Sequence, residues 1–241
     1  MAESKVYTRE ECVFLSRLNE KAEKYSEMFK YINKYVELDP KLSKEERNIL
    51  CSGYKYIISD KRNSLRILNN IEKRNTYQLA YIKEIRENIE KELYQILLDI
   101  EKMLDKYLIP NAIDIENKVF YLKLKADFMR YKCEISYGKE LYDIISKTEK
   151  IYKEANDIAN KELMISNSTR LGLALNYSVF FYDIKKMKEE AINIAKNAFD
   201  DAMKILDNLE ISKAKDTLLI IQMLKENLIF WCNEINNEFE S

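Results

Sequence analysis

The sequence contains no histidine, and glycine, proline and cysteine are scarce: three, two and four residues of 241. Without histidine, Ser-His-Asp and Cys-His catalytic groups and every zinc site with a histidine ligand are excluded. The glycines at 53, 138 and 172 are too far apart to form a glycine-rich phosphate loop. The acid pair Asp200-Asp201 forms no catalytic dyad, because neighbouring residues of a helix point about 100° apart. We therefore expect no enzyme, no catalytic residue, no metal site and no cofactor.

The scarcity of glycine and proline also predicts the fold class. An average protein has about 12% of these two residue types, and the turns of a β-protein depend on them. We therefore predict an all-α chain whose neighbouring helices are antiparallel and joined by short loops. The hydrophobic periodicity predicts nine helices, over residues 8–21, 25–38, 44–74, 76–108, 115–137, 139–163, 168–185, 188–206 and 212–236.

The sequence also lacks a charge imbalance and a long apolar run. It has 40 basic and 41 acidic residues, so general binding of nucleic acid or of a membrane surface gains no support. The longest apolar run, Leu218 to Ile221, is far too short to cross a bilayer. The polar start of the chain predicts no signal peptide. Four scattered cysteines without a CxxC pair are typical of reduced thiols, so we predict a cytoplasmic protein, with the nucleus as a second compartment.

Local signals place several helix ends. Ser43 and Glu46 have the spacing of a capping box, which predicts a helix that begins at residue 44. Pro110 ends the fourth helix, and Asp114 is a suitable N-cap for the fifth. Gly138 is predicted to stop the fifth helix as its C-cap.

The third predicted helix has a basic stripe. Steps of three and four residues place these side chains on one face: Asn48, Ser52, Lys55, Ser59, Arg62 and Arg66. The helix contributes no acid to this face, and the neutral members are small or short. The stripe is either an ordinary solvated surface or an anion-binding site.

A second group of charged residues lies on the fifth predicted helix. Lys123, Asp127 and Arg130 follow one another at helical spacing, with Tyr131 adjacent. They form either an ion ladder within the helix or a site in which Asp127 orients Arg130 and Tyr131 supplies a hydroxyl group.

Two asparagines interrupt apolar helix faces. Asn176 and Asn227 each need hydrogen-bond partners there, either neighbouring backbone or the main chain of an extended peptide. With the basic residues, they indicate a groove that has one basic and one apolar wall. Arginine clusters of this kind recognise phosphorylated motifs, because the guanidinium group matches the phosphate oxygens.

At these residues the sequence resembles the 14-3-3 family, from about Thr8 to Trp231. The matching blocks are Leu42–Asn48, Tyr54-Lys55, Tyr107–Ala112, Lys118–Lys123, Arg130-Tyr131, Arg170–Asn176, Ser178–Phe180 and Asp216–Trp231. The resemblance implies nine antiparallel helices in a cup-shaped protomer with an amphipathic groove. It also implies one helical domain over 1–236, followed by a short tail over 237–241.

The resemblance further implies an adaptor without catalysis. Such a protein binds phosphoserine or phosphothreonine peptides and clamps, masks or relocates the phosphorylated client. The implied phosphate-binding residues are Lys55, Arg62, Arg130 and Tyr131. The implied contacts to the peptide backbone are Asn176, Asn227, Asp183 and Lys123. The implied apolar groove wall consists of Leu175, Val179, Leu219, Ile220 and Met223.

A dimer, of identical or related chains, is also implied. The residues at matching interface positions are Leu18, Ala22, Lys24, Ser64, Leu68, Ile71, Ile85 and Glu92. Lys24 and Glu92 can form an ion pair across this interface, and phosphorylation of Ser64 would put charge into it.

Several residues depart from the family pattern. Asp183 replaces a glutamate, Met223 a leucine and Ile85 a tyrosine, which alters the groove and the dimer seam. The alternative interpretation is a helical scaffold that binds unphosphorylated peptides. Equal affinity for a phosphorylated peptide and its unphosphorylated twin would favour that alternative.

Overall fold

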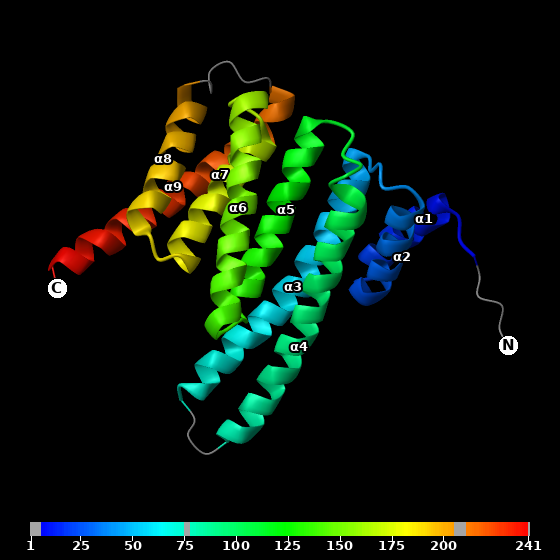
Figure 1. The fold of residues 1–241 in the computed structure, drawn as a ribbon, viewed down its shortest axis with the longest axis horizontal. Helices are drawn as coiled ribbons and strands as arrows, with labels where there is room; N and C mark the ends of the chain where they lie inside the picture. Colours follow the sequence, from blue (N-terminus) through cyan, green and yellow to red (C-terminus); the bar gives the residue numbers. More distant parts are fainter. Residues whose placement is uncertain (1–5, 75–77, 205–210, 241) are drawn as a thin grey trace. The chain divides into compact units, whose positions relative to one another are not determined.

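The protein is all-α, as the sequence predicts. The computed structural model describes residues 6–74, 78–204 and 211–240, which contain nine α-helices, two π-helical segments and no strand. By its internal contacts the chain divides into two compact units, Met1–Asn111 and Ala112–Ser241. Figure 1 labels the helices of both units. The single domain expected over 1–236 stays a prediction.

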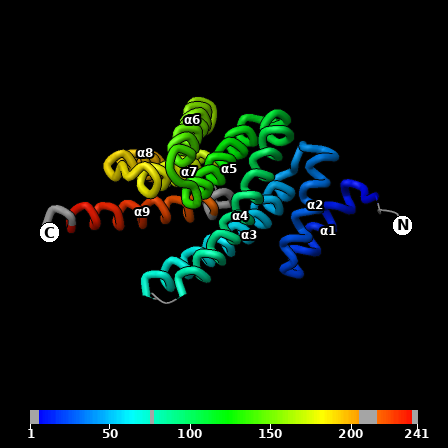
Figure 2. Tube along the Cα trace, turned by 60° about the horizontal axis from the view of Figure 1, so that its bottom comes forward, coloured from blue at the N-terminus to red at the C-terminus, as the bar shows by residue number. Residues whose placement is uncertain are grey.

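The first unit consists of four α-helices and one π-helical segment. They are α1 (Arg9–Lys21), α2 (Tyr25–Leu38), α3 (Lys44–Glu72), α4 (Leu79–Met103) and η1 (Leu104–Leu108). Figure 2 shows α3 and α4 running side by side, and α1 packs on α2. The predicted capping box begins α3, where the Ser43 hydroxyl accepts from the backbone N–H of Glu46 at 3.3 Å. A second capping box, Thr8 with Glu11, begins α1.

The core of the first unit lies between α2, α3 and α4. Its fully buried members include Met28, Ile32, Tyr54, Leu97 and Ile100. Gly53 brings α2 and α3 close together, because a Cβ atom there would lie 3.1 Å from atoms of both Met28 and Ile32. This packing leaves the opposite face of α3 toward solvent.

The second unit contains five α-helices and one π-helical segment. They are α5 (Ile115–Cys133), α6 (Gly138–Glu162), α7 (Ser168–Val179), η2 (Phe180–Ile184), α8 (Lys188–Lys204) and α9 (Ile211–Glu240). Asp114 begins α5 as predicted, since its carboxylate accepts from the backbone N–H of Asn117 at 2.7 Å. Helices α5 and α6 pack along each other (Figure 1), and α7 contacts α5, α6, α8 and α9. Helix α7 therefore carries side chains toward four other helices.

Two helix ends differ from the prediction by four residues, and the predicted helices 76–108 and 168–185 end in the π-helical segments η1 and η2. Helix α5 ends at Cys133, and Gly138 is the first residue of α6 rather than the C-cap of α5. Gly138 does have a positive φ of 57°, which glycine adopts without strain, but it serves the entry into α6. Helix α9 continues through Glu240, four residues beyond the predicted end. The predicted ends at residues 76 and 206 lie outside the described residues.

Among the helices within 6–74, 78–204 and 211–240, none is both long and apolar enough to cross a bilayer.

Candidate functional site

The basic stripe of the first unit lies on the outer face of α3. Lys55 is exposed and Arg62 is half-buried, whereas Leu50 and Tyr54 on the opposite face are buried. The helical spacing thus gives Lys55 and Arg62 one shared face, as predicted. A carboxylate from a neighbouring helix reaches this stripe, because the Ser52 hydroxyl donates to Glu20 of α1.

In the second unit, Asp127 of α5 accepts hydrogen bonds from three polar side chains. Its carboxylate accepts from Lys123 Nζ at 2.8 Å, from Asn176 Nδ2 at 2.7 Å and from the Tyr152 hydroxyl at 2.6 Å. The Asp127 side chain is buried, so these bonds replace the water that a carboxylate needs. Helices α5, α6 and α7 thereby meet at one carboxylate.

Arg130 lies beside this carboxylate and is only 7% exposed. Its Nε donates to the Tyr152 hydroxyl at 3.4 Å, and its guanidinium group lies 4.6 Å from the centre of the Tyr131 ring. Burial alone would lower the pKa of Arg130, but electrostatic interactions with Tyr152, Tyr131 and Asp127 and the hydrogen bond to Tyr152 outweigh it and raise that pKa. Arg130 therefore keeps its positive charge inside the unit.

The described contacts refine the predicted role of Asp127. The predicted ion ladder is present between Lys123 and Asp127 at i, i+4. Two hydrogen bonds link Arg130 to Asp127 by way of the Tyr152 hydroxyl, and Tyr152 was not predicted from the sequence as a site residue. Tyr152 is 25 positions from Asp127, and nothing in the local pattern of α6 marks it.

A pocket of about 320 Å³ opens beside this network, within the second unit. Four predicted residues line it: Lys123, Leu175, Asn176 and Ile220. Five further residues line this pocket and were not predicted as site residues: Phe120, Ser168, Thr169, Gly172 and Asp216. At Gly172 a Cβ atom would lie at ordinary contact distance, 3.6 Å from Lys123 Cε and 3.8 Å from Ile220 Cδ1, so only a larger side chain would fill the pocket. The only signal for Phe120, Gly172 and Asp216 was their place inside the blocks that carry the resemblance, and Ser168 and Thr169 lie outside those blocks.

The other predicted groove residues lie on α7, η2 and α9. Val179 and Asn227 are half-buried, while Leu219, Met223 and Asp183 are exposed. The C-terminal half of α9 is held against η2 by Tyr182, whose ring stacks on Trp231 with centroids 4.6 Å apart. Apolar side chains on an exposed helix face are suited to a partner that covers them.

Comparisons with known proteins support one family. The family model described as "14-3-3 protein" matches residues 15–232. The chain is 42% identical over 231 residues to 14-3-3-like protein 2 of Caenorhabditis elegans, covering 94% of this chain and 92% of that protein. It is 40% identical over 247 residues to 14-3-3-like protein D of Nicotiana tabacum, covering 100% and 99%. It is 42% identical over 229 residues to human 14-3-3 protein beta/alpha, covering 94% and 93%.

The chain belongs to the 14-3-3 family. This membership confirms the resemblance drawn from the sequence blocks, and it agrees with the all-α fold. Within the described part of the chain, no group of three or more cysteine, aspartate or glutamate side chains is placed to hold a metal ion.

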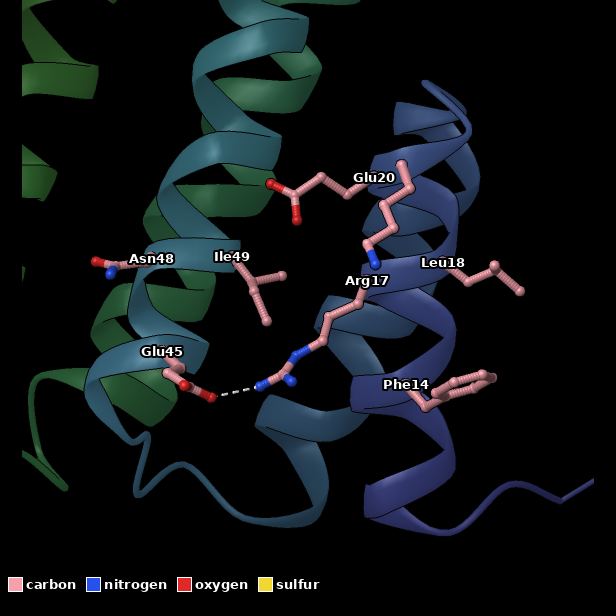
Figure 3. A pocket seen from close by; sticks show the side chains of 8 residues that line it. Phe14, Arg17, Leu18, Glu20, Glu45, Asn48 and Ile49 are labelled. Atoms are coloured by element: carbon pink, nitrogen blue, oxygen red, sulfur yellow. Dashed lines mark hydrogen bonds and ion pairs between the residues drawn. The ribbon is translucent and has the colours of Figure 1, made fainter.

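The predicted dimer residue Leu18 of α1 lines a second pocket, of about 510 Å³, inside the first unit (Figure 3). An ion pair of 2.7 Å between Arg17 and Glu45 joins α1 to α3 at this pocket. Phe14 and Leu18 point to the side of α1 away from α3 and are 64% and 51% exposed. The sequence analysis selected Leu18 and Ala22 but missed Phe14, although the spacing of four residues places all three on one face.

The remaining predicted dimer residues lie on α3 and α4, apart from Lys24, which precedes α2 and is exposed. Ser64 and Leu68 are half-buried, and Ile71 and Ile85 are exposed. Glu92 is exposed and accepts a hydrogen bond from Lys61 of the same chain. The predicted pairing of Glu92 with Lys24 of a second chain would therefore compete with Lys61.

Proposed function

We propose that this 14-3-3 protein is an adaptor that binds phosphoserine or phosphothreonine peptides and clamps, masks or relocates the phosphorylated client. Membership of the family supports phosphopeptide binding as a general role. The observation that carries the proposal is the pocket beside the Asp127 network, where cationic, amide and apolar side chains line one cavity.

The phosphate group is bound by Lys55, Arg62, Arg130 and Tyr131 in this proposal. A phosphoserine carries a charge of about −1.5 to −2 at pH 7, and two arginines with one lysine neutralise it. Arg130 supports this role because it is a buried cation held in a defined position beside Tyr131. Buried charges of this kind bind anions with less competition from water.

The peptide backbone is bound by Asn176, Lys123, Asn227 and Asp183. The Asn176 amide donates one of its two N–H groups to Asp127, which fixes its orientation, and its carbonyl oxygen can accept from a peptide N–H. Lys123 is a cationic donor that lines the same pocket as Asn176, so it suits a peptide carbonyl.

The peptide side chains would pack on the apolar wall of the groove. Its residues in this proposal are Leu175, Val179, Leu219, Ile220 and Met223. We further propose a dimer of identical or related chains, in which two grooves hold a doubly phosphorylated client by avidity. No catalytic step and no cofactor take part, and the cytoplasmic location stays a prediction.

The first test compares one arginine-rich phosphoserine peptide with its unphosphorylated twin by fluorescence anisotropy. We expect the phosphorylated form to bind far more tightly to the full chain. Lys55→Glu should abolish this binding, because it replaces a cation of the phosphate site by an anion. The control is Lys147→Glu, which makes the same charge change at an exposed position of α6.

Equal affinity for the two peptides would favour the alternative, a helical scaffold that binds unphosphorylated segments. Phosphopeptide affinity retained in Lys55→Glu would remove Lys55 from the site. A similar loss in Lys147→Glu would show a general charge effect rather than a contact with phosphate.

A further inference from the structure

Tyr152 of α6 is a buried polar group that the proposed phosphate contacts do not use. Its side chain is fully buried, and burial raises the pKa of its hydroxyl well above the ordinary value. The hydroxyl therefore stays protonated, with one proton to donate. That proton goes to Asp127 at 2.6 Å, which leaves the oxygen lone pairs to accept from Arg130 Nε at 3.4 Å. The hydrogen bonds run in one direction, from Arg130 through Tyr152 to Asp127.

The ring of Tyr152 is itself held in place by aromatic neighbours. It stacks on Tyr177 with centroids 5.2 Å apart and lies 5.4 Å from the ring of Phe180. Stacking and full burial leave the ring little freedom to change rotamer. The hydroxyl is therefore a fixed point to which a long and flexible arginine side chain can bind.

Tyr152 differs in one respect from the other partners of Asp127. Lys123 and Asn176 bond to Asp127 directly, whereas Arg130 reaches that carboxylate through the Tyr152 hydroxyl. Removal of this hydroxyl would release the Nε edge of Arg130 and leave the other two bonds in place.

We propose that Tyr152 is a positioning residue for the phosphate site: its hydroxyl holds the Nε edge of Arg130, so that the guanidinium group meets the phosphate in one orientation. This inference rests on the proposed function. An arginine held at one edge loses less rotamer freedom when it binds a phosphate, and the bound state gains accordingly. Tyr152 touches no ligand atom in this account, and its effect passes through Arg130.

The test is Tyr152→Phe in the full chain, assayed with the phosphopeptide and its unphosphorylated twin. We expect the phosphopeptide Kd to rise about ten-fold, as for loss of one hydrogen bond to a charged group, while the Kd of the twin stays unchanged. The matched control is Tyr177→Phe, which removes a hydroxyl from the ring stacked on Tyr152. It should leave both Kd values unchanged.

A merely structural role of Tyr152 would predict a different change in the two peptide affinities. If the Tyr152 hydroxyl only stabilised the second unit, the variant would weaken both peptides together. A ratio of the two Kd values that is the same in Tyr152→Phe as in the wild type would overturn this inference and leave the proposed function standing. A wild-type protein without that preference would overturn the proposed function, and the inference with it.

A second measurement does not depend on the folding of Tyr152→Phe. In the wild-type protein, the Nε–H signal of Arg130 should exchange slowly with water in a 15N-edited NMR spectrum, with Arg130→Lys used for its assignment. The exposed Arg66 provides the comparison within the same spectrum. Exchange of the Arg130 signal as fast as that of Arg66 would contradict a stable hydrogen bond from Arg130 Nε to the Tyr152 hydroxyl.

Discussion

At the scale of single residues, the candidate site depends on how each side chain orients its polar atoms and how much space it leaves in the pocket. Asn176 donates an amide N–H to Asp127, and this bond orients its carbonyl oxygen, which is the acceptor we propose for a peptide N–H. Gly172 contributes by having no side chain, because Lys123 and Ile220 lie next to the space that a Cβ atom would enter. A small residue at position 172 can thus matter for the pocket without being required by the fold.

Gly172→Leu should separate binding from stability. The new side chain would fill the pocket between Lys123 and Ile220, so we expect phosphopeptide affinity to fall at least ten-fold. The helix should gain up to about 1 kcal/mol, because glycine is a poor residue in a helix interior. Anisotropy and urea unfolding measure the two effects.

The control for this prediction is Gly172→Ala at the same position. Its Cβ atom would make contacts of 3.6 and 3.8 Å, which are ordinary van der Waals distances. We expect a similar gain in stability with affinity retained. A Leu variant that binds as well as the Ala variant would show that peptides do not enter this pocket.

At the scale of helices, the Glu46 carboxylate caps the N-terminus of α3 and also forms an ion pair with α1. Glu46 accepts from the backbone N–H of Ser43 at 2.7 Å and from Arg9 at 2.7 Å. Burial by itself would raise the pKa of Glu46, but the bonds from Arg9 and Ser43 outweigh it and lower that pKa. The start of α3, and hence the direction of its basic stripe, is stabilised by this charged group.

The lowered pKa of Glu46 predicts a dependence of stability on pH. A carboxyl group with a folded pKa below its unfolded value stabilises the protein above the unfolded value, near 4.3, and this effect is lost as the pH falls through the folded pKa. Glu46→Gln should therefore lower the free energy of unfolding by about 1–3 kcal/mol at pH 7, with a smaller difference below pH 4.

Glu45→Gln is the matched control, since Glu45 is the preceding residue and also pairs with an arginine of α1. That pair is exposed, so its loss should cost only about 0–1 kcal/mol. Urea unfolding of both variants at pH 7 and at acid pH makes the comparison. An equal cost for the two variants at pH 7 would contradict the role assigned to Glu46.

At the scale of the whole molecule, the first unit carries apolar side chains that its own core does not cover. Phe14 and Leu18 form an exposed face on α1, while Ile71 and Ile85 are exposed on α3 and α4. Surfaces of this kind are suited to a protein partner, and family membership supports a dimer in general. Exposed ion pairs add little to such contacts, so the apolar residues should dominate the dimer free energy.

Ile85→Glu should therefore shift the protein from dimer to monomer. A buried, unpaired carboxylate in an apolar interface is strongly unfavourable, so we expect sedimentation equilibrium to give the mass of one chain instead of two. The control is Ile113→Glu, at a position with a comparable exposed fraction of 58% against 50% for Ile85. A wild-type monomer, or a dimer that persists in Ile85→Glu, would contradict the proposed interface.

Some of the site could be predicted because its signals are local. The spacing of Lys55 and Arg62 placed them on one helix face, and the pairing of Lys123 with Asp127 followed from an i, i+4 spacing. Tyr152 could not be found this way, because a tyrosine on the inner face of a helix is an ordinary core residue in the sequence. Only its contact with a carboxylate 25 positions away distinguishes it.

The sequence by itself determined the helical class, most helix ends and the family. These depend on short-range rules: caps such as Ser43 and Asp114, apolar periodicity, and residue blocks that match in order. The tertiary structure alone decided the partners of each buried polar group, the pocket beside Gly172 and the held position of Arg130. These depend on which side chains meet when helices far apart in the sequence pack together, and a buried charge or hydroxyl must find its partner there because water is excluded.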